Sequence, residues 1–121
     1  MARKILVVED GKDMSEMITA RLKSNKNYDV MNAKDGLEGL EMAGREMPDL
    51  ILLDVKMPVM DGFTVLKNLK QDKKTRPIPV VMLTAFDKMK DLFKAEGVMD
   101  YIIKPFDGAS VMERIKKILG E

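Results

Sequence analysis

The sequence predicts an α/β domain in which a parallel β-sheet is covered by helices on both faces. Five short apolar runs alternate with five stretches whose apolar residues recur every three or four positions, the spacing of an amphipathic helix. One run, residues 50–53, is apolar at every position, which is typical of a strand buried on both faces. Alternation of this kind favours parallel strands joined by right-handed helical crossovers.

The five expected strands are short runs bounded by polar or turn residues. They cover residues 5–8, 28–33, 50–53, 80–83 and 101–103. The second of these runs has the weakest apolar pattern.

The five expected helices each carry an apolar stripe. Asp13, Asp35 and Asp61 are expected to begin helices, because an aspartate side chain accepts hydrogen bonds from the free backbone N–H groups of a first turn. The fourth stripe is the shortest. The stripes consist of Met14, Met17, Ile18 and Leu22; Leu37, Leu40, Ala43 and Met47; Phe63, Leu66 and Leu69; Met89, Leu92 and Phe93; and Val111, Ile115, Ile118 and Leu119.

The composition limits both the partners and the chemistry of this domain. The 21 lysines and arginines balance 20 aspartates and glutamates, so the net charge is +1. The basic excess that usually accompanies binding to nucleic acids or anionic membranes is missing. The chain contains no cysteine and no histidine, which excludes disulfides, thiolate chemistry, imidazole metal sites and histidine bases. Catalysis would therefore depend on carboxylates, lysines, hydroxyl groups and a hard metal ion.

The length of 121 residues suits one domain, and we expect residues 1–121 to form it. The apolar run at 5–8 stops at Glu9 and Asp10, so it is too short for a signal peptide. No apolar stretch approaches the ~20 residues that cross a bilayer. We therefore expect a cytoplasmic protein that does not bind membranes.

Polar side chains follow four of the expected strands. Glu9 and Asp10 come after the first, Asp54 after the third, Thr84 after the fourth and Lys104 after the fifth. Ligands of an open parallel sheet bind beyond the carboxyl ends of its strands, so these side chains are expected to converge. Three converging carboxylates repel one another and one lysine cannot neutralise them, which indicates a hard divalent cation, Mg²⁺. An aspartate beside Mg²⁺, a lysine and a hydroxyl group has the parts for phosphoryl transfer.

Four segments carry a resemblance to a known family. KILVVED at 4–10, DVKMPVMDG at 54–62, VVMLTA at 80–85 and YIIKPF at 101–106 resemble, in this order and spacing, the signature segments of response-regulator receiver domains of two-component signalling. The resemblance covers essentially the whole chain. It implies a doubly wound, flavodoxin-like fold with five helices and five parallel strands in the order 2-1-3-4-5.

The resemblance also implies a phosphorylation switch. Asp54 would accept a phosphoryl group from a histidine of a sensor kinase or of a histidine phosphotransfer protein, and Thr84 and Lys104 would bind the phosphoryl oxygens. Tyr101 would swing inward when Thr84 moves. This would change the face made of the fourth helix, the fifth strand and the fifth helix, which a downstream protein would recognise. The chain would not be an enzyme, because it would assist only its own phosphorylation and dephosphorylation.

A metal site follows from the same resemblance. Asp10, Asp54 and the backbone carbonyl of Lys56 would bind Mg²⁺ directly. Glu9 is one methylene longer than the aspartate often found at this position, and it would act through a metal-bound water.

The segment between Thr84 and Lys104 departs from the family's pattern. These residues are 20 positions apart. The spacing is shorter than usual by about two residues, roughly half a helical turn, and the loss is expected in the fourth helix or its flanking loops. Ala85 is small and would leave access to the phosphoacceptor, whereas Phe86 is expected to shield the acyl phosphate from water and to slow dephosphorylation. The peptide bond before Pro105 corresponds to one that is usually cis in the family.

Three other functions stay open at this point. A flavodoxin-like electron carrier would hold its FMN phosphate in the loop at 9–13, whose three acids disfavour a phosphate, and the chain has no tryptophan to stack on the flavin. A haloacid-dehalogenase-like phosphatase would need a second aspartate at position 56, where this chain has Lys56. A receiver fold could also serve as a docking module without phosphorylation.

Overall fold

The computed structural model describes residues 2–84, 97–104 and 106–121. The strands are β1 (Arg3–Val8), β2 (Tyr28–Ala33), β3 (Leu50–Asp54), β4 (Val80–Thr84) and β5 (Asp100–Ile103). The helices in these residues are α1 (Lys12–Lys23), α2 (Gly36–Glu46), α3 (Gly62–Gln71) and α5 (Gly108–Leu119), and none of them is long and apolar enough to cross a bilayer. The expected fourth helix, with Met89, Leu92 and Phe93, lies outside the described residues, as do Ala85, Phe86 and Pro105.

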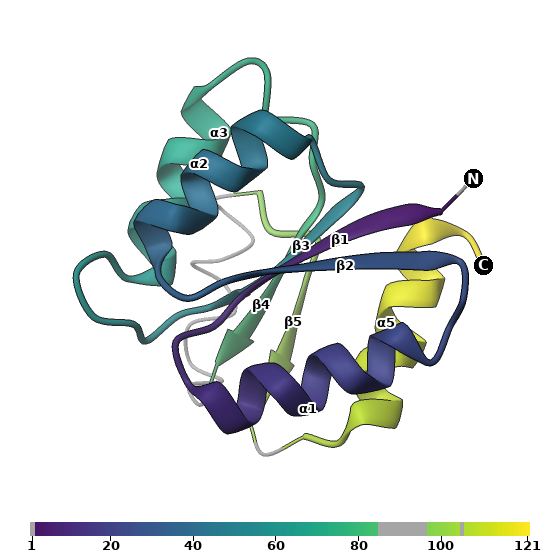
Figure 1. The fold of residues 1–121 in the computed structure, drawn as a ribbon. Helices are drawn as coiled ribbons and strands as arrows, with labels where there is room; N and C mark the ends of the chain where they lie inside the picture. Colours follow the sequence, from purple (N-terminus) through teal and green to yellow (C-terminus); the bar gives the residue numbers. More distant parts are fainter. Residues whose placement is uncertain (1, 85–96, 105) are drawn as a thin grey trace.

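The strands form one parallel sheet of five strands in the order β2-β1-β3-β4-β5. This confirms the predicted α/β fold and its strand order. Figure 1 shows α2 and α3 on one face of the sheet and α1 and α5 on the other. The sheet is therefore the middle of three layers, as expected when helical crossovers join parallel strands.

The strand β3 lies at the centre of the core. The side chains of Leu50, Ile51, Leu52 and Leu53 are all 0% exposed. Leu50 and Leu52 pack beneath α1 and α5, whereas Ile51 and Leu53 pack beneath α2 and α3. Successive side chains of a strand point to opposite faces, so a strand between two helical layers must be apolar at every position. Each of these side chains stabilises the fold by about 1.5–3 kcal/mol.

Aspartates begin several of the helices. Asp35 and Asp61 are the N-caps of α2 and α3, and each accepts a backbone hydrogen bond at 2.8 Å, as predicted. The prediction for Asp13 was wrong, because α1 begins at Lys12 with Gly11 as its N-cap. Asp13 lies inside the first turn instead, where its charge favours the positive end of the helix. Asp107 caps α5 in the same way as the first two, at 2.7 Å.

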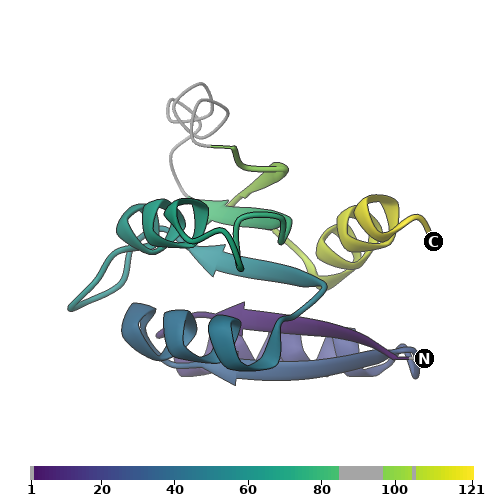
Figure 2. The same cartoon turned by 90° about the horizontal axis from the view of Figure 1, so that it is seen from above.

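The carboxyl ends of the strands share one edge of the sheet, on the side away from both chain termini (Figure 2). Asp54 and Thr84 are the last residues of β3 and β4. Glu9 and Asp10 follow β1, and Lys104 follows β5. The fold therefore brings the five polar residues singled out in the sequence to the same edge.

Candidate functional site

Three carboxylates meet at this edge of the sheet. Glu9, Asp10 and Asp54 each place a carboxylate oxygen within 4.8 Å of the other two. The strand register brings Glu9 and Asp54 together, because Val8 of β1 pairs with Leu53 of β3 and each is followed by one of these acids. Glu9 is 5% exposed and Asp54 is 2% exposed, whereas Asp10 is open to solvent. Two of the three carboxyl groups are therefore shielded from water.

Lys104 places a positive charge against this cluster. Its Nζ atom donates to Asp54 Oδ1 at 3.0 Å. Its backbone N–H donates to the carbonyl oxygen of Thr84 at 2.7 Å, which fixes the base of the lysine side chain beside the end of β4. The Lys104 side chain is only 24% exposed, so its attraction to Asp54 is screened less than that of a surface ion pair.

The surroundings of Glu9 favour its protonated form. Burial raises the pKa of Glu9 from 4.5 to about 8, assisted by the hydrogen bond that the protonated carboxyl shares with Asp54 and by the charge of Asp54. The charge of Lys104 and the N–H of Gly11, which donates to Glu9 Oε1 at 3.2 Å, act in the opposite direction. No donor in the described residues reaches the buried Oε2 atom of Glu9. An ionised Glu9 therefore lacks a partner for one oxygen.

A hard divalent cation fits this set of ligand atoms. Asp10 and Asp54 alone carry more negative charge than Lys104 balances, and Glu9 Oε2, once ionised, is a buried acceptor that a cation or its water shell would satisfy. Oxygen atoms are the ligands that Mg²⁺ prefers, and its sites in proteins combine carboxylates with waters and phosphate oxygens. The residues present therefore suit Mg²⁺.

The other predicted residues lie around this cluster. Thr84 is 1% exposed and follows Leu83, which pairs with Asp54 between β3 and β4. Tyr101 is partly buried in β5 and packs against the core beneath α2 and α3. Lys56 lies two positions after Asp54 with an exposed side chain. The metal-binding role of the Lys56 carbonyl and the movement of Tyr101 stay predictions.

The family model of the response regulator receiver domain matches residues 5–116. The chain belongs to this family. Receiver domains of response regulators are signalling switches controlled by phosphorylation, so the match favours this function over the electron carrier and the phosphatase considered above.

This receiver domain is similar to parts of longer regulators. It is 42% identical over 120 residues to the response regulator PleD of Caulobacter vibrioides, a match that covers 98% of this chain and 26% of PleD. It is 43% identical over 123 residues to the alkaline phosphatase synthesis transcriptional regulatory protein PhoP of Bacillus subtilis, a match that covers 98% of this chain and 49% of PhoP. The chain thus spans between 26% and 49% of the length of these two relatives.

Solved structures of receiver domains have the same fold. The chemotaxis response regulator CheY4 of Vibrio cholerae matches with a TM-score of 0.90 at 30% identity, covering 98% of this chain and 99% of CheY4. The receiver domain of the sensor histidine kinase PA1611 of Pseudomonas aeruginosa matches with a TM-score of 0.88 at 29% identity, covering 100% of both chains. That structure holds a magnesium ion coordinated in its active site cleft.

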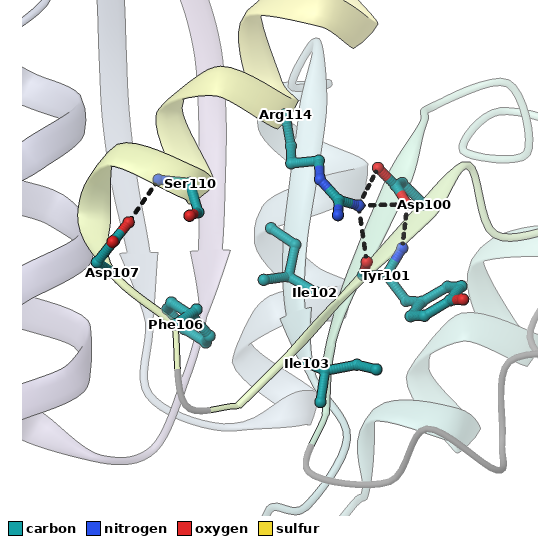
Figure 3. A pocket seen from close by; sticks show the side chains of 8 residues that line it. All are labelled: Asp100, Tyr101, Ile102, Ile103, Phe106, Asp107, Ser110 and Arg114. Atoms are coloured by element: carbon teal, nitrogen blue, oxygen red, sulfur yellow. Dashed lines mark hydrogen bonds and ion pairs between the residues drawn. The ribbon is translucent and has the colours of Figure 1, made fainter.

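An ion pair between β5 and α5 was not anticipated from the sequence. Arg114 Nη1 of α5 donates to both carboxylate oxygens of Asp100, at 3.0 and 2.9 Å, and to the carbonyl oxygen of Tyr101 at 3.2 Å (Figure 3). No local pattern marks this pair, although α5 directly follows β5 and packs back along it. The pair borders a cavity of about 640 Å³ in this receiver domain. Its lining residues are Asp100, Tyr101, Ile102, Ile103, Phe106, Asp107, Ser110 and Arg114.

Proposed function

We propose that this receiver domain is a cytoplasmic switch whose Asp54 accepts a phosphoryl group from a phosphohistidine of a sensor histidine kinase or of a histidine phosphotransfer protein. The observation that carries the proposal is the position of Asp54. Its carboxylate is 2% exposed, lies 3.0 Å from the Lys104 ammonium and belongs to a cluster of three acids. Gathering buried charges in this way costs stability, and such clusters are typical of functional sites. The domain would act on no separate substrate, since it would assist only its own phosphorylation and dephosphorylation.

The transfer is a displacement at phosphorus. An oxygen of Asp54 forms the new P–O bond while the P–N bond to the donor histidine breaks, and the electron pair of that bond returns to the imidazole. Lys104, which already lies 3.0 Å from Asp54, neutralises charge on the transferring group, and the Thr84 hydroxyl donates to one of its oxygens. The step needs no general base from this chain, which agrees with its lack of histidine.

Mg²⁺ is the proposed cofactor. Asp10, Asp54 and the backbone carbonyl of Lys56 would hold the ion directly, and Glu9 would act through a bound water. The three neighbouring carboxylates and the unpaired Oε2 atom of Glu9 support this assignment, as does the magnesium ion in the related receiver domain of PA1611. When bound, the ion supplies positive charge beside the oxygens of the phosphoryl group.

The proposed output is a shift between two conformations. Thr84 would move toward the phosphoryl group and Tyr101 would turn inward, which would change the surface of β5, α5 and the fourth helix. The cavity of about 640 Å³ beside Tyr101 lies on this surface, which supports our proposal that a protein target binds there (Figure 3).

We propose that this domain does not bind nucleic acid directly, because its net charge of +1 does not favour such binding. The DNA-binding dual master transcriptional regulator RpaA of Synechocystis is 38% identical to this chain, which covers 48% of RpaA.

Intact-mass measurement after incubation with acetyl phosphate tests the proposal. With Mg²⁺ present the parent should gain one phosphoryl group, and EDTA or the Asp54→Asn change should abolish the gain. Asp29→Asn, which alters an exposed aspartate of β2, is the matched control and should be labelled like the parent. A parent that gains no phosphoryl group would leave docking without phosphorylation as the function, whereas an Asp54→Asn variant that still gains one would exclude Asp54 as the phosphoacceptor.

A further inference from the structure

A smaller cavity, of about 450 Å³, lies where the end of α1 crosses α5 (Figure 1). Three segments line it: the end of α1, the turn that leads into β2 and one side of α5. Because the sheet is parallel, the start of β2 lies at the opposite edge from the one that carries Asp54. The cavity is therefore separate from the acidic cluster. Its lining residues are Arg21, Ser24, Asn25, Lys26, Met112 and Lys116.

The charged side chains around this cavity are all positive. Arg21, Lys26 and Lys116 each come from a different segment, and no acidic side chain of the described residues lines the cavity. Within the part of the chain that the structure describes, none of the three belongs to an ion pair. Helix dipoles favour cations in last turns, which accounts for Arg21 and Lys116 separately but not for Lys26 or for the meeting of all three. Like charges around one cavity repel one another, so an anion between them would stabilise the arrangement.

The stem of Arg21 packs on the first turn of α5. A Cβ atom added at Gly108 would lie 2.9 Å from Arg21 Cγ, so the stem crosses α5 where position 108 has no side chain. This packing restrains the arginine, which then loses less freedom when its guanidinium group binds a ligand. The acid facing Arg21 from α5 is Asp107, whose pKa is lowered by the N–H of Ser110 with help from the charge of Arg21. Asp107 does not approach Arg21 closely enough to form an ion pair.

The donors around the cavity suit the oxygens of a phosphate-bearing anion. A guanidinium group binds two phosphate oxygens at once, and ammonium groups add positive charge. Asn25 Oδ1 already accepts from the N–H of Asn27 at 2.9 Å, which leaves the NH₂ group of Asn25 to donate. The volume is in the range of small-molecule sites. Of the described residues that line the cavity only Met112 is apolar and none is aromatic, which favours a compact anion over an apolar ligand.

We propose that this cavity binds a pyrophosphate group, either free or as part of a nucleotide. Arg21 would bind oxygens of one phosphate, while Lys26 and Lys116 would neutralise the charge of the pair. The ligand would join α1, α5 and the turn before β2, which meet at this cavity. The inference does not rest on the proposed function, because the cavity and the phosphoacceptor share no residue.

Titration of the parent with sodium pyrophosphate, followed by the amide NMR signals, tests this site. Mg²⁺ is left out, so that no metal ion links the anion to the acidic cluster. The signals of Arg21, Lys26 and Lys116 should shift and reach saturation. Lys26→Gln and Lys116→Gln should each weaken binding about fivefold, as expected for the loss of one exposed charge. Lys117→Gln is the matched control, because it removes the same charge from the next exposed position of α5, outside the cavity, and should weaken binding less than about twofold.

Titration with ADP separates the two sources of the pyrophosphate group. Equal affinities for ADP and inorganic pyrophosphate would show that the site recognises the phosphates alone, and tighter binding of ADP would assign it to a nucleotide. Signals that do not shift, or that shift without saturating at millimolar pyrophosphate, overturn the inference. Equal weakening by Lys116→Gln and Lys117→Gln also overturns it, because the anion would then respond to the overall charge of α5. Sodium sulfate that binds as tightly as pyrophosphate at equal ionic strength overturns it as well.

Discussion

The ammonium group of Lys104 lies 3.0 Å from Asp54 Oδ1, although the two residues are 50 positions apart in the chain. The contact joins the end of β3 to the residue that follows β5, across the end of β4. In the unmodified protein, Lys104 offsets the repulsion between Asp54 and the neighbouring acids. After phosphorylation the same ammonium group would face a phosphoryl oxygen, so one residue would stabilise both states.

Replacing Lys104 with methionine should lower both stability and phosphorylation. Lys104→Met keeps most of the side-chain volume and leaves the buried Asp54 carboxylate without its partner. The free energy of unfolding without Mg²⁺ should fall by about 1–3 kcal/mol, measured by urea denaturation, and labelling by acetyl phosphate should slow. Lys117→Met, at an exposed position of α5, is the control and should change neither. An unchanged denaturation midpoint in Lys104→Met would mean that the ion pair does not stabilise the metal-free fold.

Replacing Asp10 with asparagine should stabilise the metal-free fold and weaken its stabilisation by Mg²⁺. In EDTA, Asp10→Asn relieves repulsion within the acidic cluster, so its thermal midpoint should exceed that of the parent by roughly 2–5 °C. Excess Mg²⁺ should raise the midpoint of the parent, because a ligand that binds only the folded state stabilises it, and should raise that of Asp10→Asn much less. Asp29→Asn should respond to Mg²⁺ like the parent. A parent midpoint that does not respond to Mg²⁺ would rule out the proposed metal site.

Replacing the aspartate at the start of α2 should destabilise the fold more than replacing the aspartate at the start of α1. Asp35 accepts a hydrogen bond from the N–H of Glu38 at 2.8 Å, so Asp35→Ala should lower the free energy of unfolding by about 1 kcal/mol. Asp13 lies inside the first turn of α1, behind the N-cap Gly11. Asp13→Ala should therefore lose only the interaction with the helix dipole, about 0.3–0.5 kcal/mol. Urea denaturation compares the two variants, and equal losses would contradict this difference.

The same helix starts explain what the sequence could predict. Asp35 and Asp61 each stand two positions before the first residue of an apolar stripe, Leu37 and Phe63, and α2 and α3 begin directly after these aspartates. The stripe of α1 begins at Met14, and the cap was therefore expected at Asp13. The helix begins earlier, at Lys12, because polar residues can occupy a first turn without adding to the stripe. Patterns of apolar residues detect the buried face of a helix and not its exposed ends.

The candidate site was predictable to a similar extent. Parallel strands end on the same side of a sheet, so the convergence of Asp54, Lys104 and their neighbours followed from the order of strands and helices. The 3.0 Å contact and the burial that raises the pKa of Glu9 depend on packing between side chains of different strands. The turn at Val59 could not be predicted either, because its φ of 68° is one that valine normally avoids.

Tyr28 should ionise well above the usual range of tyrosine. Burial of its hydroxyl group, with the carboxylate of Glu121 nearby, raises the pKa of Tyr28 from 10.0 to about 12. The folded pKa exceeds the unfolded one, so the neutral phenol contributes stability below pH 10.0, which is lost as the pH rises toward 12. The chain has 2 tyrosines, so in Tyr101→Phe the ultraviolet absorbance of tyrosinate reports Tyr28 alone. The transition should lie near pH 12 in the folded protein and near pH 10.0 in urea, and coincident transitions would contradict the burial.

The proposed switch requires that Thr84 pass the change at Asp54 to Tyr101. Thr84 ends β4 and is 1% exposed, and Tyr101 lies on the neighbouring strand β5. Thr84→Val keeps the branched shape of the side chain and removes the hydroxyl group. Acetyl phosphate should still label Thr84→Val, more slowly, because Asp54 and Lys104 are unchanged. The aromatic NMR signals of Tyr101, which should shift when the parent is phosphorylated, should stay in place in this variant.

Thr84→Ser is the matched control, because it keeps the hydroxyl group and should retain the shift of the Tyr101 signals. If these signals move equally in Thr84→Val, the hydroxyl group does not carry the change. A second route is then available through the backbone, since the N–H of Lys104 donates to the carbonyl oxygen of Thr84 at 2.7 Å. Both variants keep this hydrogen bond. The pair of variants therefore separates a switch driven by the Thr84 side chain from one in which Lys104 moves β5 directly.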